Sequence, residues 1–401
     1  MKLSRRVTEL AESATLAVSA KAARMRAEGV DVVSFGAGEP DFDTPAHIRQ
    51  AAIDALNEGQ TRYPNPAFGL TVARQAVCNS LARDANLRYG PEQVIITSGG
   101  KDAAYLAFHA LLDPGDEVVI PKPYWVSYPE MVRLAGGVPV FAVGTEKNDY
   151  KLTPEILRSA LTPRTRMFIF NSPSNPSGVT YHPEEVRALA QVLQDRDLVV
   201  LSDEIYDRLL YDGQKTLSYA AASDRAYAQT LTCNSASKTY AMTGWRLGYA
   251  AGPVEIIKSM AKLQSQSTSG AATFSQIAYA KALTGDQACV EAMRVEFERR
   301  GAHMWRRLTD MPGIRCPRPT GAFYCFPNVS RTYGKLGVHG SVEFAARLLE
   351  QARVAVVPGE AFGMDQHVRL SFATGMPQID KGLDRIEAFL RAEGAERVVS
   401  C

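Results

Sequence analysis

The chain lacks both a long apolar run and a strong excess of charge. Among its 401 residues, 45 Lys and Arg face 43 Asp and Glu, which gives a formal net charge of +2. Nucleic acid and anionic membranes attract basic surfaces, and no segment reaches membrane-spanning length, so we expect neither partner. The first residues carry Glu9, Glu12 and Lys21 where a signal peptide needs an apolar core, which predicts a cytoplasmic protein.

Cysteine motifs and nucleotide-binding motifs are missing as well. The six cysteines form no C-x-x-C pair and stand at no metal-ligand spacing to a histidine, so we expect reduced thiols and no metal site. The stretch "SFGAGEPD" supplies Gly36 and Gly38, but Asp41 stands where a dinucleotide fingerprint needs its third glycine. No G-x-x-x-x-G-K-[ST] sequence occurs either. These absences exclude a Rossmann-type dinucleotide site and a P-loop.

What the chain does contain is an alternation of short apolar strands and helical stretches. The strand-like runs include "EQVIITSGG", "DEVVIPKP", "RMFIFNSP", "DLVVLSDEIY" and "AQTLTCNSAS". Such an alternation predicts βαβ units and therefore an α/β fold with a mostly parallel central sheet flanked by helices. Ligands of such sheets bind just past the carboxyl ends of the strands.

The pattern changes near residue 290. "QACVEAMRVEFERRGAHMWRRLTDM" predicts a long amphipathic helix, and "GAFYCFPNV", "VAVVPGEAF" and "HVRLSFA" predict strands of an antiparallel α+β unit. We therefore predict a large domain over residues 46–288. Residues 1–45 and 289–401 together would form a smaller α+β domain.

Two candidate features concern a lysine and a glycine-rich turn. Lys238 in "SASKTYAMTGWRLGYA" follows a predicted strand among hydroxyl side chains, but a lone lysine there is ordinarily a solvated loop residue. Gly99 and Gly100 in "VIITSGGKDA" lead from a strand directly into a helix, whose free N–H groups favour an anion. A plain strand–helix turn explains these glycines equally well.

Four further residues stand at or near strand ends. Asp203 ends an apolar run, where a carboxylate is costly to bury without a partner, although a helix N-cap is a serious alternative. Asn175 in "NSPSNPSG" suits an Asx turn as well as a ligand contact. Trp125 more often packs than stacks on a ligand. Arg369 in "HVRLSFA" suits bidentate carboxylate recognition, but an exposed strand arginine is the simpler interpretation of that stretch alone.

Taken together, these side chains match what pyridoxal 5′-phosphate (PLP) requires. That cofactor needs an amine for a Schiff base, an anion site, an acid beside its pyridine nitrogen and a ring to stack on. The chain then resembles the fold-type I PLP enzymes of the class I/II aminotransferase family, and most closely the bacterial aspartate aminotransferases of the Iγ type (subgroup Ib). The resemblance rests on ordered motifs along nearly the whole chain: "SATLAVSAKA", "GAGEPDFDTP", "TSGGKDA", "PYWVSYPEM", "NSPSNPSG", "SDEIY", "SASKTYAMTGWRLGY", "PTGAFY", "VAVVPG" and "HVRLSFA".

The resemblance implies a role for each matching residue. Lys238 matches the Schiff-base lysine, which moves protons between the substrate α-carbon and the cofactor. Asp203 matches the partner of the pyridine nitrogen, and Tyr206 and Asn175 match donors to the ring's phenolic oxygen. Trp125 matches the stacking ring. The matching phosphate ligands and neighbours are Gly99, Gly100, Lys101, Ser235, Ser237 and Arg246, with Tyr63 reaching the site of a neighbouring subunit. The resemblance therefore implies a homodimer.

Substrate contacts are implied in the same way. Arg369 matches the arginine that binds the substrate α-carboxylate, and Gly38 matches the backbone that lies over the substrate. Lys101 matches a lysine that contacts the distal carboxylate. The pocket would also be lined by Trp125, Asn175 and Thr15. A cation at a helix N-terminus is otherwise unfavourable, which favours a functional reason for Lys101. These matches predict reversible amino transfer from L-aspartate to 2-oxoglutarate, giving oxaloacetate and L-glutamate.

Other functions are compatible with the same fold. The chain could be an aromatic, prephenate or alanine aminotransferase, or a PLP carbon–sulfur lyase. Ala11 stands where relatives that accept prephenate carry a lysine, which argues against that activity. A PLP-binding regulator without catalysis is a further alternative, but nothing before residue 30 could be a DNA-binding domain.

Overall fold

The computed structural model describes residues 2–8, 10 and 14–395, and a seven-stranded sheet forms its centre. The sheet order is β2-β8-β7-β6-β5-β3-β4, and β8 runs antiparallel to β2 and β7 whereas the other neighbours are parallel. The predicted α/β fold with a mostly parallel sheet is thereby confirmed. The strands are β2 (Val94–Thr97), β3 (Glu117–Lys122), β4 (Val138–Val143), β5 (Thr165–Asn171), β6 (Val199–Asp203), β7 (Thr230–Ser235) and β8 (Gly248–Ala251).

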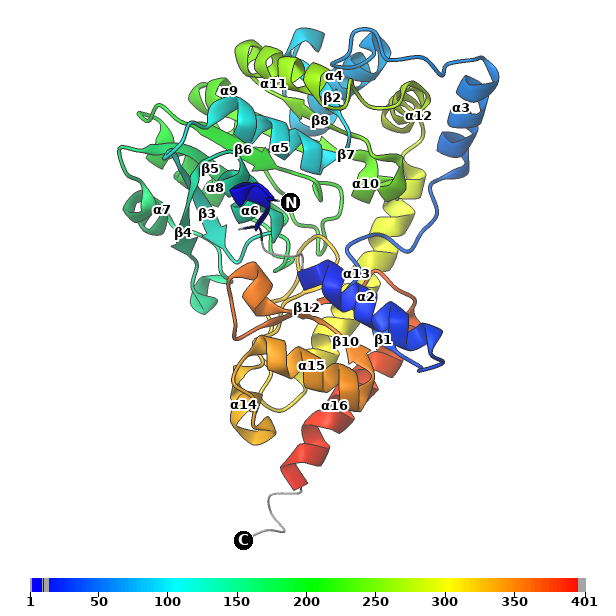
Figure 1. Ribbon diagram of the computed structural model, residues 1–401, viewed down its shortest axis with the longest axis vertical. Helices are drawn as coiled ribbons and strands as arrows, with labels where there is room; N and C mark the ends of the chain where they lie inside the picture. The colour runs from blue at the N-terminus through cyan, green and yellow to red at the C-terminus, as the bar shows by residue number, and fades with distance from the viewer. Residues whose placement is uncertain (1, 9, 11–13, 396–401) are drawn as a thin grey trace.

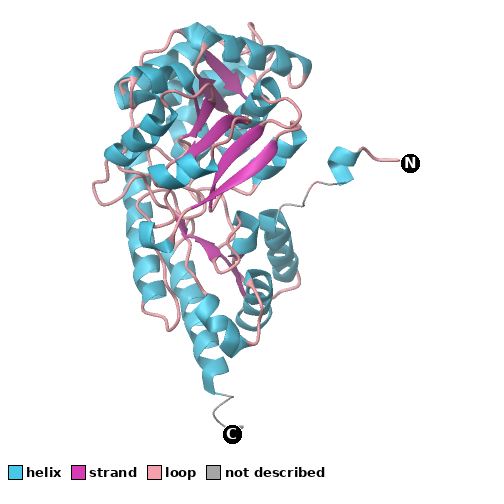
Figure 2. Ribbon diagram, turned by 90° about the vertical axis from the view of Figure 1, so that its left-hand side faces the viewer, coloured by secondary structure: helices cyan, strands magenta, loops and turns pink. Residues whose placement is uncertain are grey.

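Helices cover both faces of this sheet, as Figure 2 shows. In β5, Phe168 and Phe170 pack against one helical layer, whereas Met167 and Ile169 pack against the other. Side chains alternate across a strand, and both faces of a parallel sheet are buried, so the strands read as continuous apolar runs. One layer contains α7 (Pro154–Ala160) and α8 (Pro183–Leu193), and the other α5 (Gly100–Leu111), α6 (Ser127–Leu134) and α11 (Val254–Gln266).

A third helical group packs near the β2–β8 end of the sheet. It contains α3 (Ala46–Asn57), α4 (Thr71–Ala85) and α12 (Thr273–Thr284). Two short helices, α9 (Asp224–Gln229) and α10 (Ala236–Thr239), flank β7 in sequence. The position of α10 matters for function because it begins directly at the carboxyl end of a central strand.

The C-terminal third forms a smaller α+β unit, drawn in yellow to red in Figure 1. Its three-stranded sheet has the order β11-β12-β9, and both pairs are antiparallel as predicted. A parallel pair, β1 with β10, was not predicted. The elements are β1 (Val33–Ser34), β9 (Tyr324–Cys325), β10 (Val354–Ala355), β11 (Val357–Pro358), β12 (Val368–Ser371), α13 (Ala288–Thr309), α14 (Ser330–Leu336), α15 (Ser341–Ala352) and α16 (Met376–Ala395).

The N-terminal segment contributes α1 (Arg5–Thr8) and α2 (Ala14–Ala27). Val33 and Phe35 share an apolar core with the C-terminal helices. The boundaries at residues 45 and 288 stay a prediction. Among the described residues, no helix has both the length and the apolar character needed to cross a membrane.

Candidate active site

A cavity of about 680 Å³ lies where the carboxyl ends of the central strands meet the smaller unit. This is the place where ligands of open α/β sheets bind. It brings together most of the side chains that the sequence singled out. Its lining includes Gly38, Gly100, Lys101, Trp125, Asn175, Asp203, Tyr206, Ser237, Lys238, Arg246 and Arg369.

Lys238 reaches the cavity from α10. The Ser235 hydroxyl accepts a hydrogen bond from the Ser237 N–H at 3.1 Å and so caps this one-turn helix, which fixes the direction of the lysine. The Lys238 ammonium donates to the Gly38 carbonyl. Burial, and then the nearby Arg369, lower the pKa of Lys238 to about 8. The residue is therefore a partly desolvated amine inside a cavity and not a solvated loop lysine.

Asp203 closes the same cavity from the end of β6. Its Oδ2 accepts a hydrogen bond from the Tyr128 hydroxyl, and its Oδ1 accepts one from the Ile205 N–H at 3.3 Å. Burial raises the pKa of Asp203, and the hydrogen bonds oppose that rise. A buried carboxylate with a raised pKa is suited to share a proton with a basic ring nitrogen.

An anion-binding corner forms at the N-terminus of α5. Gly99 has φ +98°, a conformation that L side chains rarely adopt, and it turns the chain from β2 into the helix. Arg246 lies beside this turn and donates to the Ser98 carbonyl at 3.3 Å. Ser237 lines the cavity, whereas Ser235 is buried behind it as the cap of α10. Free N–H groups, a helix dipole and a guanidinium thus converge on one point.

Arg369 is buried and only 2% exposed, so the simpler interpretation of an exposed strand arginine is wrong. The reason is that β12 is the middle strand of its sheet and all four of its residues are buried. One Nη donates to the Asn175 side-chain oxygen at 3.0 Å and the other to the Gly36 carbonyl at 3.1 Å. The Nε has no partner among the described residues. A buried guanidinium that lines the cavity is suited to receive a carboxylate.

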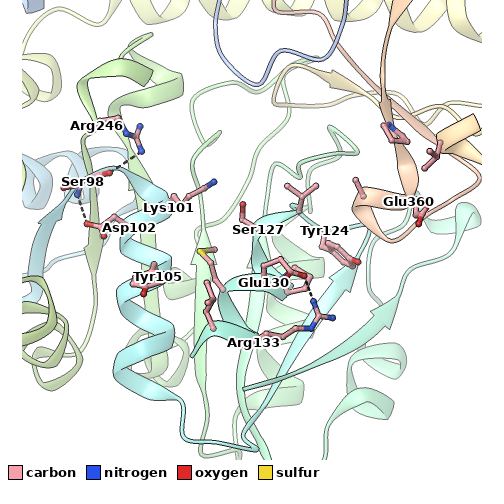
Figure 3. Close-up of a pocket in the computed structure, with 17 residues that line it drawn as sticks. Ser98, Lys101, Asp102, Tyr105, Tyr124, Ser127, Glu130, Arg133, Arg246 and Glu360 are labelled. Atoms are coloured by element: carbon pink, nitrogen blue, oxygen red, sulfur yellow. Dashed lines mark hydrogen bonds and ion pairs between the residues drawn. The ribbon is translucent and has the colours of Figure 1, made fainter. Parts of the chain in front are cut away.

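Lys101 and Trp125 form another wall. The Lys101 Nζ lies 5.1 Å from the centre of the Trp125 ring system, and burial and then Arg246 lower the pKa of Lys101. A second cavity, of about 770 Å³, adjoins this wall. Figure 3 shows Lys101 and Arg246 at one end of it and the Glu130–Arg133 ion pair farther along. Lys101 and Arg246 therefore stand between the two cavities.

Comparison with known proteins decides the family. The family model "Aminotransferase class I and II" matches residues 30–386. The chain belongs to the class I and II aminotransferases.

Individual relatives match nearly the whole chain. This chain is 49% identical to an aspartate aminotransferase of Geobacillus stearothermophilus, and the match covers 98% of this chain and 100% of the relative. It is 45% identical to an aspartate/prephenate aminotransferase of Cereibacter sphaeroides, covering 96% of this chain and 98% of the relative. The solved aspartate aminotransferase of Thermus thermophilus with maleate superposes with a TM-score of 0.92 at 45% identity, covering 96% of this chain and 99% of that one.

Among the described residues, three predicted site residues do not line this cavity: Gly99, Ser235 and Tyr63. Tyr63 is 84% exposed on the surface. Thr15 belongs to α2, but its side chain lies outside the described part of the structure, as does Ala11 altogether. Tyr63 does not line the cavity of its own chain, so its predicted role requires a second subunit.

Sequence reasoning missed the residues that orient the predicted ones. Tyr128 bonds to Asp203, and the Tyr324 hydroxyl lies 2.9 Å from that of Tyr206. The Tyr324 ring also lies 4.4 Å from the Arg369 guanidinium. The only signal in the sequence was their presence inside "PYWVSYPEM" and "PTGAFY", because the contacts join segments distant along the chain.

Proposed function

We propose that this aminotransferase binds PLP in the cavity and transfers the amino group of L-aspartate to 2-oxoglutarate, giving oxaloacetate and L-glutamate. The observation that carries the proposal is one cavity that holds Lys238, Asp203 and Arg369 together, with Lys101 on its wall. Relatives that match over nearly their full length and are named aspartate aminotransferases support the choice of substrate.

The residues present fit PLP. When bound, PLP supplies an electron sink for the bond broken at the substrate α-carbon. Asp203 would pair with the protonated pyridine nitrogen, because its burial favours a shared proton. Trp125 would stack on the ring, and Tyr206 and Asn175 would approach its phenolic oxygen. The anion-binding corner would hold the phosphate through the N–H groups of Gly100 and Lys101 and the side chains of Ser235, Ser237 and Arg246, with Gly99 forming the turn.

Lys238 would carry the cofactor and act on the substrate proton. Its lowered pKa of about 8 increases the fraction of neutral amine near neutral pH, and only a neutral amine can attack a carbonyl or accept a proton. The Gly38 carbonyl orients the amine from the opposite side of the cavity. The same nitrogen would accept the proton from the substrate α-carbon and would move it between that carbon and the bound cofactor.

Two cations would select a dicarboxylic substrate. Arg369, which lines the cavity, would bind the α-carboxylate through its fork of donors. Lys101 would meet the distal carboxylate, with Gly38 and Thr15 near the substrate. A neutral amino acid would form no ion pair with Lys101, which favours a dicarboxylic substrate over it.

We further propose a homodimer. Large apolar side chains are exposed on α3, α4 and α5 and in the loop that carries Tyr63: Ile53, Leu56, Tyr63, Val72 and Tyr105. Burial of such side chains favours association. The cytoplasmic location stays a prediction from the sequence.

The function is tested by incubating the protein with PLP, aspartate and 2-oxoglutarate and measuring oxaloacetate and glutamate. Lys238→Ala is expected to lose turnover and the visible absorption band of the bound cofactor. Absence of both products with the unmodified protein would refute the aspartate assignment, and survival of the band in Lys238→Ala would refute the role of the lysine.

A second specificity is favoured by one observation, the 45% identical relative named aspartate/prephenate aminotransferase. The same assay with prephenate, aromatic amino acids and alanine as substrates separates these activities. Release of pyruvate and ammonia would instead indicate a carbon–sulfur lyase.

A further inference from the structure

A buried hydrogen bond joins the region around the central sheet to the strand that carries Arg369. Tyr150 lies in the connection between β4 and α7, and His367 directly precedes β12. The Tyr150 hydroxyl lies 2.6 Å from the His367 Nε2, and the two rings meet edge to face with centroids 5.0 Å apart. Figure 1 shows the β4–α7 region at the edge of the large sheet, above the orange C-terminal segments.

Burial makes this a bond between two neutral groups. His367 is 0% exposed, and burial lowers its pKa to about 4, so the ring is neutral at physiological pH. A neutral imidazole carries its proton on one of its two nitrogens, so Nε2 either accepts from the Tyr150 hydroxyl or donates to it. Without that hydroxyl, Nε2 would be a buried polar atom with no partner, which is among the more costly defects in a protein interior.

A chain of aromatic ring contacts links His367 to Arg369. The His367 ring lies parallel to Phe326 with centroids 4.7 Å apart, and Phe326 meets Phe362 edge to face at 5.8 Å. The Arg369 guanidinium lies 5.1 Å from the centre of the Phe362 ring. His367 and Arg369 are also two residues apart in an extended chain, so their side chains point to the same side.

We propose that Tyr150 is a positioning residue for substrate binding. Its bond to His367 fixes the start of β12 and thereby the orientation of the Arg369 guanidinium. The inference rests on the proposed role of Arg369 as the α-carboxylate contact. Tyr150 is not among the residues that line the cavity with Lys238, so its effect falls on substrate affinity and not on the reacting atoms.

The test is Tyr150→Phe, which removes one oxygen and keeps the ring. We expect the KM for the amino-acid substrate and the Kd of maleate, a substrate-like dicarboxylate, to rise about fivefold to tenfold, corresponding to the loss of one buried hydrogen bond. The kcat and the absorption spectrum of the bound cofactor stay within about twofold, because Lys238 and Asp203 are not moved.

Tyr181→Phe is the matched control. Its hydroxyl is also buried and accepts from the Leu152 N–H at 2.7 Å, two residues from Tyr150, but that bond does not reach β12. It should lower the Tm without changing the KM. An unchanged KM in Tyr150→Phe, or an equal rise in Tyr181→Phe, would overturn the inference.

A double-mutant cycle adds a readout that general destabilisation would not produce. Replacing both partners, as in Tyr150→Phe with His367→Leu, leaves no buried polar atom unpaired, so the effects on maleate affinity should be far from additive. Additive losses would contradict the coupling. If the unmodified enzyme does not accept aspartate, the proposed function fails on its own, and the same cycle is then measured with the amino acid that the enzyme does accept.

Discussion

Lys238 illustrates how a single buried amine links stability to pH. Its folded-state pKa of about 8 lies below the ordinary value of 10.5, so the unfolded chain binds more protons between these values. The stability of the cofactor-free protein should therefore rise with pH from about 8 to 10.5, by up to about 3 kcal/mol from this group. Below pH 8 the stability should no longer change with pH through this group, because the buried charge is then fully present and destabilises the folded state.

Denaturant unfolding of the cofactor-free protein against Lys238→Met checks this dependence. The variant should be more stable than the unmodified chain at pH 7, because it buries no charge, and the difference should shrink as the pH is raised toward 10. A difference that stays constant over this range would mean that the Lys238 pKa is not lowered.

At the scale of an element, the turn from β2 into α5 offers a sharp test of the anion-binding corner. A Cβ on Gly99 would overlap the Arg246 guanidinium, in addition to the strain of φ +98°. Gly99→Ala should therefore displace Arg246 and weaken PLP binding by about tenfold or more, as measured by equilibrium dialysis.

Gly115 supplies the matched control for backbone strain alone. It has a similar φ of +94°, and a Cβ there would have nothing within 4 Å. Gly115→Ala should lose stability but keep its PLP affinity. Equal losses of affinity in both variants would show that the Gly99 effect comes from strain and not from Arg246.

The helices and strands show which features of the fold could be predicted from the sequence. Strands β2, β3, β5, β6 and β7 of the large sheet and the α13 helix followed from local patterns, because periodicity and turn residues act over a few positions. The roles predicted for Lys238, Asp203 and Arg369 came instead from the resemblance of their motifs to a known family. The β1–β10 pair and the burial of Arg369 did not follow from local patterns, since they depend on which distant segments become neighbours. The Tyr128 contact to Asp203 was missed for the same reason: it joins residues 75 positions apart.

At the scale of the whole molecule, the proposed homodimer raises the question of which chain supplies each residue of a site. Tyr63 is exposed and stands outside the cavity of its own chain, so a role in phosphate binding requires it to reach the cavity of a second copy. In that arrangement a site takes Lys238 from one chain and Tyr63 from the other. Tyr63→Ala and Lys238→Ala then damage opposite halves of the same site.

A hybrid dimer distinguishes the two arrangements. Co-expression of Tyr63→Ala and Lys238→Ala chains with different tags, and purification through both tags, gives a dimer with one copy of each. If Tyr63 acts across the interface, one site of the hybrid carries both defects and the other carries none, so at limiting PLP the activity should recover to about half that of the unmodified dimer. If Tyr63 acts within its own chain or not at all, no such recovery over Tyr63→Ala occurs. A sedimentation mass of a single chain for the unmodified protein would refute the dimer itself.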